Sequence, residues 1–126
     1  MTSRKVVLVV DDDQRLVQGL QDYLESQGYV VYTANDGVQA YPLASARHPS
    51  LIILDIDMPM TDGFKALQRL RAEPETKNIP VILMTGIASA GVYPAIKNMP
   101  LLSHVKKPIA PEDLLSLVRH YIPESV

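Results

Sequence analysis

Two apolar runs of this 126-residue chain end in closely spaced carboxylates. The runs are residues 6–10 and 51–54, and the acids that follow them are Asp11, Asp12 and Asp13 and then Asp55 and Asp57. Carboxylates gathered at one point repel one another, and the repulsion raises their pKa values. A hard divalent cation removes this repulsion, because Mg²⁺ takes a few carboxylate oxygens and keeps waters, which leaves room for a phosphate. Asp11, Asp12 and Asp55 therefore predict a metal site, provided that the fold brings the two run ends together.

Two further segments that could form strands end in groups that could bind a phosphoryl group. Residues 81–84 lead into Thr85, and residues 102–105 lead into Lys106 and Lys107. A metal and an amine would neutralise the charge of a phosphoryl group, and a hydroxyl would donate a hydrogen bond to it. Taken alone, the threonine is better explained as a turn residue, and either lysine as a solvated side chain. Because side chains alternate along a strand, only one of the two lysines should reach the site, and the spacing does not say which.

A carboxylate can also act as a nucleophile, since its attack on phosphorus forms an acyl phosphate. Asp55 and Asp57 are the candidates for this role. Asp13 is better explained as the N-cap of the following helix, because an aspartate in that position accepts hydrogen bonds from the first helical N–H groups.

The elements that must position these groups can be predicted from the hydrophobic pattern. The apolar runs at residues 6–10, 51–54 and 81–84 are short, continuous and rich in aliphatic residues, which is typical of strands buried on both faces of a parallel sheet. Residues 102–105 are a weaker strand candidate. Residues 29–33 supply a further strand, and segments with helical spacing lie at 14–27, at 64–73 and after Pro111. The alternation predicts an α/β fold with a doubly wound parallel sheet and right-handed crossovers. Such a sheet has its site at the carboxyl ends of its strands, where the groups above would meet.

Two helix boundaries are indicated by single residues. Gly28 follows the first helical segment, at the position where a left-handed residue often ends a helix. Pro111 suits the first turn of the last helix, and Glu112 and Asp113 beside it suit the positive end of the helix dipole.

Two other helices are expected to be poor. Pro42 interrupts the segment after Gly37, and a proline inside a helix costs about 3 kcal/mol. The stretch between residues 86 and 100 contains Gly91 and Pro94. It therefore predicts only a short or distorted helix.

The composition is that of one globular domain. The chain has 47% hydrophobic and 21% charged residues, no cysteine and a net charge of −2. These values exclude a disulfide framework and a cysteine-based zinc site, and they give no electrostatic case for nucleic-acid binding. No apolar stretch reaches the roughly 18 residues of a membrane-spanning helix, and no signal peptide is evident. We expect a single cytoplasmic domain over residues 1–126, without membrane insertion or direct nucleic-acid contact.

Four motifs occur in order along the chain: VLVVDDD, LIILDIDMPMTDG, VILMTG and VKKP. Together they closely resemble the receiver domain of bacterial two-component response regulators, the family of the chemotaxis regulator and the sporulation phosphorelay regulator. The resemblance extends over about residues 5–122. It implies a flavodoxin-like receiver fold, with five parallel strands in the order 2-1-3-4-5 and helices on both faces. It also implies a phosphorylation-dependent signalling switch.

The resemblance assigns a role to each residue of the site. Asp55 would accept the phosphoryl group from a histidine kinase or a histidine phosphotransfer protein, with Mg²⁺ or Mn²⁺ as the cofactor. The metal ligands would be Asp11, Asp12, Asp55 and the backbone carbonyl of Asp57. Thr85 would be the switch hydroxyl that moves toward the phosphoryl group. Lys107, directly before Pro108, would be the phosphate-binding amine in preference to Lys106.

Three departures from the family fall on the surface through which it passes its signal on. His104 stands three positions before Lys107, where the family usually has Tyr or Phe as an aromatic switch. A histidine could still change rotamer and would titrate near neutral pH, but a partly exposed strand-end residue without a switching role explains it equally well. Residues 99–101 (MPL) replace the usual turn of small residues, and Pro94 falls inside the fourth helix.

Asp57 occupies a position that varies in the family. Its side chain is expected near the path of the water that hydrolyses the acyl phosphate. We predict that this carboxylate modulates the lifetime of the phosphorylated state.

Two other functions fit parts of the sequence. Asp55-Ile56-Asp57 also resembles the motif of haloacid-dehalogenase-type phosphohydrolases, although Met58-Pro59 and the position in mid-chain fit that family poorly. A phosphate-independent pseudo-receiver adaptor is a third interpretation. As a receiver, the chain would phosphorylate and slowly dephosphorylate itself but would turn over no independent substrate. The sequence does not identify its downstream effector, and it does not say whether phosphorylation produces a dimer. It also leaves open whether the domain stands alone or belongs to a longer regulator.

Overall fold

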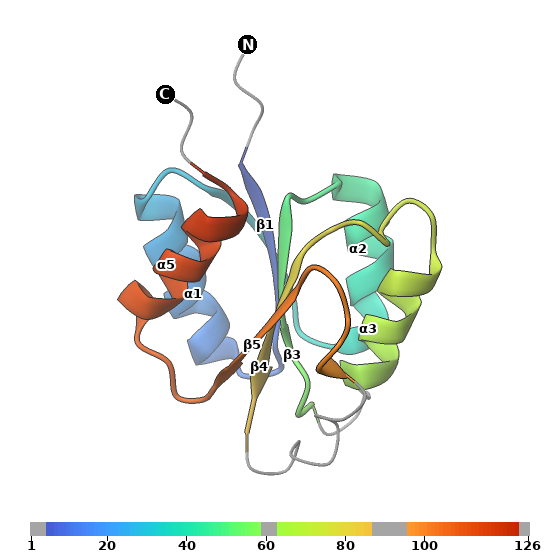
Figure 1. The fold of residues 1–126 in the computed structure, drawn as a ribbon. Coiled ribbons are helices and arrows are strands. Elements are labelled where there is room, and N and C mark those ends of the chain that lie inside the picture. Colours follow the sequence, from blue (N-terminus) through green and yellow to red (C-terminus); the bar gives the residue numbers. More distant parts are fainter. Residues whose placement is uncertain (1–4, 59–62, 87–95, 124–126) are drawn as a thin grey trace.

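The structure is a computed structural model that describes residues 5–58, 63–86 and 96–123, and it has three layers (Figure 1). A parallel sheet of five strands, in the order β2-β1-β3-β4-β5, lies between two layers of helices. The strands are β1 (Val6–Val10), β2 (Val30–Ala34), β3 (Leu51–Asp55), β4 (Val81–Thr85) and β5 (Leu102–Lys106). The helices are α1 (Gln14–Ser26), the 3₁₀ helix η1 (Gly37–Gln39), α2 (Ala40–Arg47), α3 (Gly63–Ala72) and α5 (Pro111–Tyr121). The predicted fold and strand order are confirmed.

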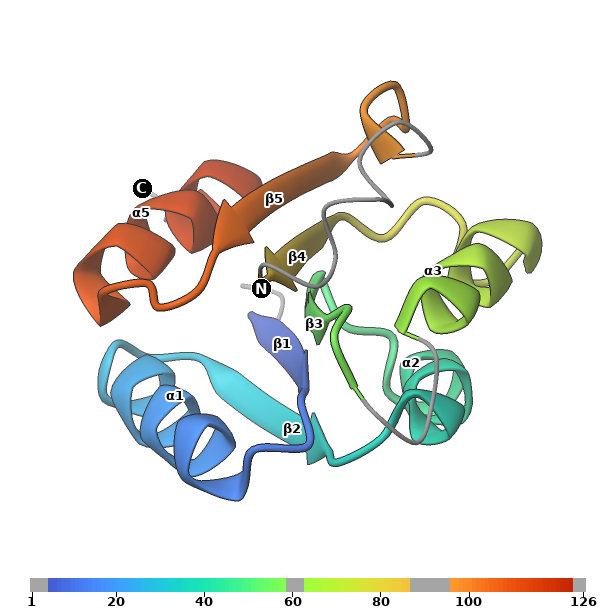
Figure 2. The ribbon, with the colours of Figure 1, turned by 90° about the horizontal axis from the view of Figure 1, so that it is seen from below.

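Side chains of the central strands alternate between two cores, one on each face of the sheet. Along β1, Val7 and Val9 pack with α1 and α5, whereas Leu8 and Val10 pack with α2 and α3. Figure 2 shows these two pairs of helices on opposite sides of the sheet. Because both faces are covered, β1 and β3 are buried along their whole length, which explains their uninterrupted aliphatic sequence.

The strand order reverses at β1, which lies between β2 and β3. Val10 pairs with Leu54 in the parallel ladder of β1 and β3, so that the two strands end side by side. The acids that follow these strands are thereby brought to the same point of the sheet edge, as the switch-point rule for open α/β sheets predicts.

Three predicted helix boundaries are confirmed. The Asp13 side chain caps α1, accepting hydrogen bonds from the N–H groups of Arg15 (3.1 Å) and Leu16 (3.2 Å). Gly28, beyond the end of α1, has a left-handed φ of 97°. Pro111 is the first residue of α5.

The prediction that Pro42 interrupts its helix is wrong. The segment begins as η1, where the Asp36 carboxylate accepts a hydrogen bond from the N–H of Gln39 at 3.0 Å. The α-helix α2 starts only at Ala40, so Pro42 is its third residue. In the first turn of a helix the backbone N–H has no intrahelical partner, and proline loses nothing by lacking it. The other helix expected to be poor lies mainly outside the described residues, and so do Gly91 and Pro94.

The turn before β5 contains a left-handed residue that is not glycine. Leu101 has a φ of 57°, a conformation that costs an L-residue roughly 1–2 kcal/mol. The guanidinium of Arg71 in α3 supports this turn, since it donates hydrogen bonds to the carbonyls of Leu101 (2.8 Å) and Ile79 (2.6 Å). Burial lowers the pKa of this arginine. Among the described residues, none of the helices is both long and apolar enough to cross a membrane.

Candidate functional site

Three carboxylates meet at the edge of the sheet where β1 and β3 end. Oxygen atoms of Asp11, Asp12 and Asp55 lie within 4.8 Å of one another. Asp11 is fully buried and Asp55 is 2% exposed, whereas Asp12 is exposed to solvent. The structure thus brings together the three acids that the sequence indicated for a metal site.

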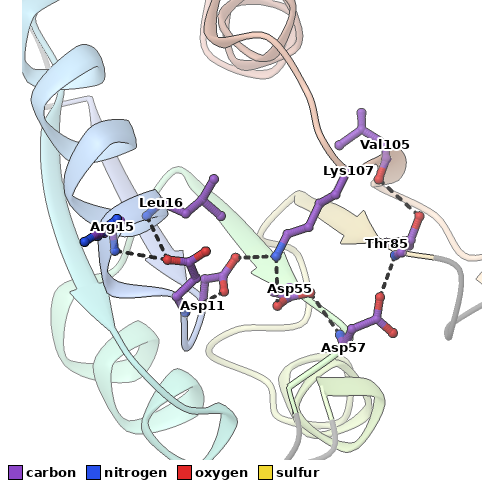
Figure 3. A network of polar contacts seen from close by, with 10 residues as sticks. Asp11, Arg15, Leu16, Asp55, Asp57, Thr85, Val105 and Lys107 are labelled. Carbon is purple, nitrogen blue, oxygen red and sulfur yellow. Dashed lines mark hydrogen bonds and ion pairs between the residues drawn. The ribbon is translucent and has the colours of Figure 1, made fainter.

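Lys107 reaches this cluster from beyond the end of β5 (Figure 3). Its Nζ lies 2.9 Å from Oδ2 of Asp11 and 3.1 Å from Oδ2 of Asp55. Lys106, the alternative amine, is exposed. Burial lowers the pKa of the Lys107 ammonium, but its hydrogen bonds and ion pairs with the two carboxylates outweigh this effect and raise it overall. The ammonium therefore stays charged at neutral pH.

The charge of the cluster is only partly compensated by the protein. The pKa of Asp11 is raised from 3.8 to about 6, mainly because the carboxylate is buried, and the charge of Asp55 acts in the same direction. The N–H of Asp13, which donates a hydrogen bond to Oδ1 of Asp11 at 2.9 Å, and the ammonium of Lys107 act in the opposite direction. A single lysine faces two buried acids, so the site carries an excess of negative charge.

The arrangement fits a hard divalent cation. Oδ2 of Asp11 is buried and receives no well-aligned hydrogen bond from the described residues, although Lys107 lies within ion-pair distance. An incompletely satisfied carboxylate oxygen, directed into a group of oxygens, is what Mg²⁺ or Mn²⁺ requires. The role of the Asp57 backbone carbonyl as a fourth ligand stays a prediction.

Asp55 is held from two sides. One oxygen, Oδ1, accepts a hydrogen bond from the N–H of Asp57 at 2.9 Å, and the other is bound by Lys107. Gly63, at the start of α3, packs against the backbone after β3. A Cβ at this position would lie 2.6 Å from the carbonyl oxygen of Asp55 and from Cα of Ile56, which leaves no room for a side chain. In the sequence, Gly63 stands out only as the last residue of the motif LIILDIDMPMTDG, which does not indicate this packing role.

Thr85 lies at the end of β4, beside the acids, but its hydroxyl is not directed at them. It donates a hydrogen bond to the backbone carbonyl of Val105 at 3.1 Å (Figure 3). The backbone carbonyl of Thr85 in turn accepts a hydrogen bond from the N–H of Lys107 at 2.8 Å. Thr85 is therefore bound to the β5 segment, and its role as a switch stays a prediction.

The Asp57 side chain makes a contact that the sequence did not predict. Its Oδ2 accepts a hydrogen bond from the backbone N–H of Gly86 at 2.5 Å, across 29 positions of the chain. A Cβ at Gly86 would lie 2.9 Å from the same oxygen, so glycine permits this close approach. His104 in β5 is exposed and is not part of the acidic cluster. Its switching role also stays a prediction.

The fold and the site together define the class of protein. An open parallel sheet carries buried acids at the ends of its first and third strands, with a lysine beyond the fifth strand paired to both. The chain matches the model of the response regulator receiver domain over residues 7–119, and it therefore belongs to that family. The resemblance stated from the sequence motifs is confirmed.

Particular relatives agree with this assignment. The chain is 37% identical over 118 residues to the probable transcriptional regulator ycf29 of Porphyra purpurea, which covers 92% of this chain and 56% of that protein. It is 29% identical over 118 residues to the polar-differentiation response regulator DivK of Brucella ovis, covering 94% of this chain and 96% of DivK. The solved structure of Vibrio cholerae chemotaxis protein CheY4 matches with a TM-score of 0.85 and 29% identity, covering 94% of this chain and 99% of CheY4. The chain thus spans about half the length of the ycf29 regulator and nearly all of the other two.

Proposed function

We propose that this receiver domain is a signalling switch controlled by phosphorylation of Asp55. The donor would be the phosphohistidine of a histidine kinase or of a histidine phosphotransfer protein. The observation that carries the proposal is the position of the Lys107 ammonium, 3.1 Å from Oδ2 of Asp55 and 2.9 Å from Oδ2 of Asp11. A fixed positive charge at this point is what the negative oxygens of a transferred phosphoryl group need.

In the proposed transfer, a carboxylate oxygen of Asp55 forms a bond to phosphorus while the bond from phosphorus to the donor imidazole breaks. The N–H of Asp57 and the ammonium of Lys107 orient the carboxylate before the attack. Asp11, Asp12 and Asp55, with the backbone carbonyl of Asp57, would hold Mg²⁺ or Mn²⁺. When bound, such a cation neutralises part of the phosphoryl charge.

The output would follow from a change at Thr85. The hydroxyl would leave the Val105 carbonyl, to which it now donates, and turn toward the phosphoryl group. The segments after β4 and β5 would then shift between two conformations, and a partner or an output domain would read the difference. A phosphorylation-dependent dimer is one form that this output could take.

The test is phosphoryl transfer from a radiolabelled histidine phosphotransfer protein in the presence of Mg²⁺. We expect about one phosphoryl group per chain, cleavable by hydroxylamine as an acyl phosphate should be, and no label on Asp55→Ala. Asp22→Asn, which removes an exposed acid of α1, is the control and should label like the parent.

Two experimental outcomes would contradict the proposed function and favour a different one. Multiple turnover of p-nitrophenyl phosphate that depends on Asp55 and Asp57 would favour the haloacid-dehalogenase-type phosphohydrolase. An amide spectrum left unchanged by beryllofluoride with Mg²⁺ would favour the phosphate-independent adaptor.

A further inference from the structure

The Asp57 side chain connects the Thr85-Gly86 segment, which contains the proposed switch residue, to the acidic site. The Asp57 carboxylate accepts a hydrogen bond from the N–H of Gly86 at 2.5 Å, and the backbone N–H of Asp57 donates a hydrogen bond to Oδ1 of Asp55 at 2.9 Å. Asp57 therefore links the proposed phosphoacceptor to the residue directly after Thr85. Figure 3 shows the Asp57 carboxylate turned away from Asp55 and toward the end of β4.

The hydrogen bond is specific to the residue types at its two ends. A carboxylate accepts a stronger hydrogen bond than a neutral group, because the acceptor is charged. Gly86 allows the approach, since a Cβ would lie 2.9 Å from Oδ2 of Asp57 and would force the two groups apart. Together with the bonds from Thr85 to Val105 and from Lys107 to Thr85, it holds the end of β4 in one conformation.

We propose that the Asp57 carboxylate is an internal anion that holds the Thr85-Gly86 segment in the unphosphorylated conformation, and that a phosphoryl group on Asp55 displaces it. A phosphoryl group adds negative charge and acceptor oxygens two residues from Asp57. The carboxylate is repelled, and phosphoryl oxygens compete for the N–H groups at the end of β4. Asp57 is thus a positioning residue that keeps the switch segment in its resting place. This inference deepens the proposed function and rests on it.

The test uses the full chain without phosphate or metal, followed by amide NMR. In Asp57→Ala we expect the Gly86 amide resonance to move and its hydrogen-exchange protection to fall by about tenfold, the effect of losing one charge-assisted hydrogen bond. Asp57→Asn, which keeps an acceptor but not the charge, should give a smaller change in the same direction. Asp36→Ala is the matched control, since it removes a carboxylate that accepts the backbone N–H of Gln39 at 3.0 Å, and it should leave Gly86 unchanged.

A second measurement follows the displacement. On addition of beryllofluoride with Mg²⁺, the Gly86 resonance of the parent should move away from its resting position, whereas in Asp57→Ala much of that movement should already be present beforehand. An unchanged Gly86 amide in unphosphorylated Asp57→Ala would overturn the inference while leaving the proposed function intact. Absence of any beryllofluoride response or label in the parent would instead contradict the proposed function.

Discussion

Replacing Asp11 by asparagine should stabilise the metal-free protein at neutral pH, although Asp11 is one of the predicted metal ligands. Its carboxylate is fully buried and shares one lysine with Asp55. In the folded protein the pKa of Asp11 is about 6, against 3.8 for an ordinary aspartate. At 1.36 kcal/mol per pKa unit, this difference corresponds to about 3 kcal/mol.

The sign follows from proton linkage. The folded state holds the Asp11 proton more tightly than the unfolded state does. The contribution of this protonation to the free energy of unfolding is therefore fully present below pH 3.8, and it is lost as the pH rises to about 6. Asparagine does not titrate, and it retains an oxygen that can accept the N–H of Asp13. It loses the ion pair with Lys107, so we expect a net gain of roughly 1–3 kcal/mol at pH 8 and little difference at pH 4.

The assay is urea unfolding of the parent and Asp11→Asn in EDTA, at several pH values between 4 and 8. For a urea m-value of about 2 kcal/mol per molar, the midpoint of the variant should lie about 1 M higher at pH 8. Asp22→Asn removes an exposed charge and should show no such pH dependence. When Mg²⁺ replaces the EDTA at 100 times the dissociation constant of the parent, it should stabilise the parent by about 2.7 kcal/mol and the variant much less. A variant that is no more stable than the parent at pH 8, or a gain of equal size at pH 4, would refute this account of the site's electrostatics.

Three further predictions concern single positions. Asp57→Asn should change the rate at which the phosphorylated protein loses its label with Mg²⁺ present, because it removes a negative charge two residues from the proposed acceptor; equal decay rates would contradict this role. Leu101→Gly should raise the free energy of unfolding by up to about 1 kcal/mol, since the left-handed φ of 57° is free of strain in glycine, and a lower urea midpoint would argue against it. Gly63→Ala should destabilise the fold by roughly 1–3 kcal/mol and slow labelling of Asp55, because the added Cβ meets the Asp55 carbonyl at 2.6 Å. Gly19→Ala, where a Cβ would meet nothing within 4 Å, is its control, and equal losses in both variants would show that the Asp55 contact is unimportant.

The order of elements could be predicted from the sequence because it depends on local signals. The aliphatic runs of β1, β3 and β4 reflect strands covered on both faces, and Asp13 and Gly28 mark the ends of α1 by their own backbone preferences. The acids could be assigned to one site because parallel strands deliver their carboxyl ends to the same edge of a sheet. Pro42 shows the limit of such signals, since the effect of a proline on helix stability depends on its distance from the helix start. The η1 turn precedes α2, which begins only at Ala40, so Pro42 lies in the first turn.

The sequence by itself therefore determined which residue types could form the site and at which edge of the sheet they would lie. Only the tertiary structure decided which of them touch. It placed the Lys107 ammonium against Asp11 and Asp55, it directed the Thr85 hydroxyl to Val105, and it joined Asp57 to Gly86. Each of these contacts joins two segments that are at least 20 residues apart, so it depends on strand register and on the path of the loops. Hydrophobic periodicity does not encode those properties, because they follow from how the strands pair and not from the pattern within any one of them.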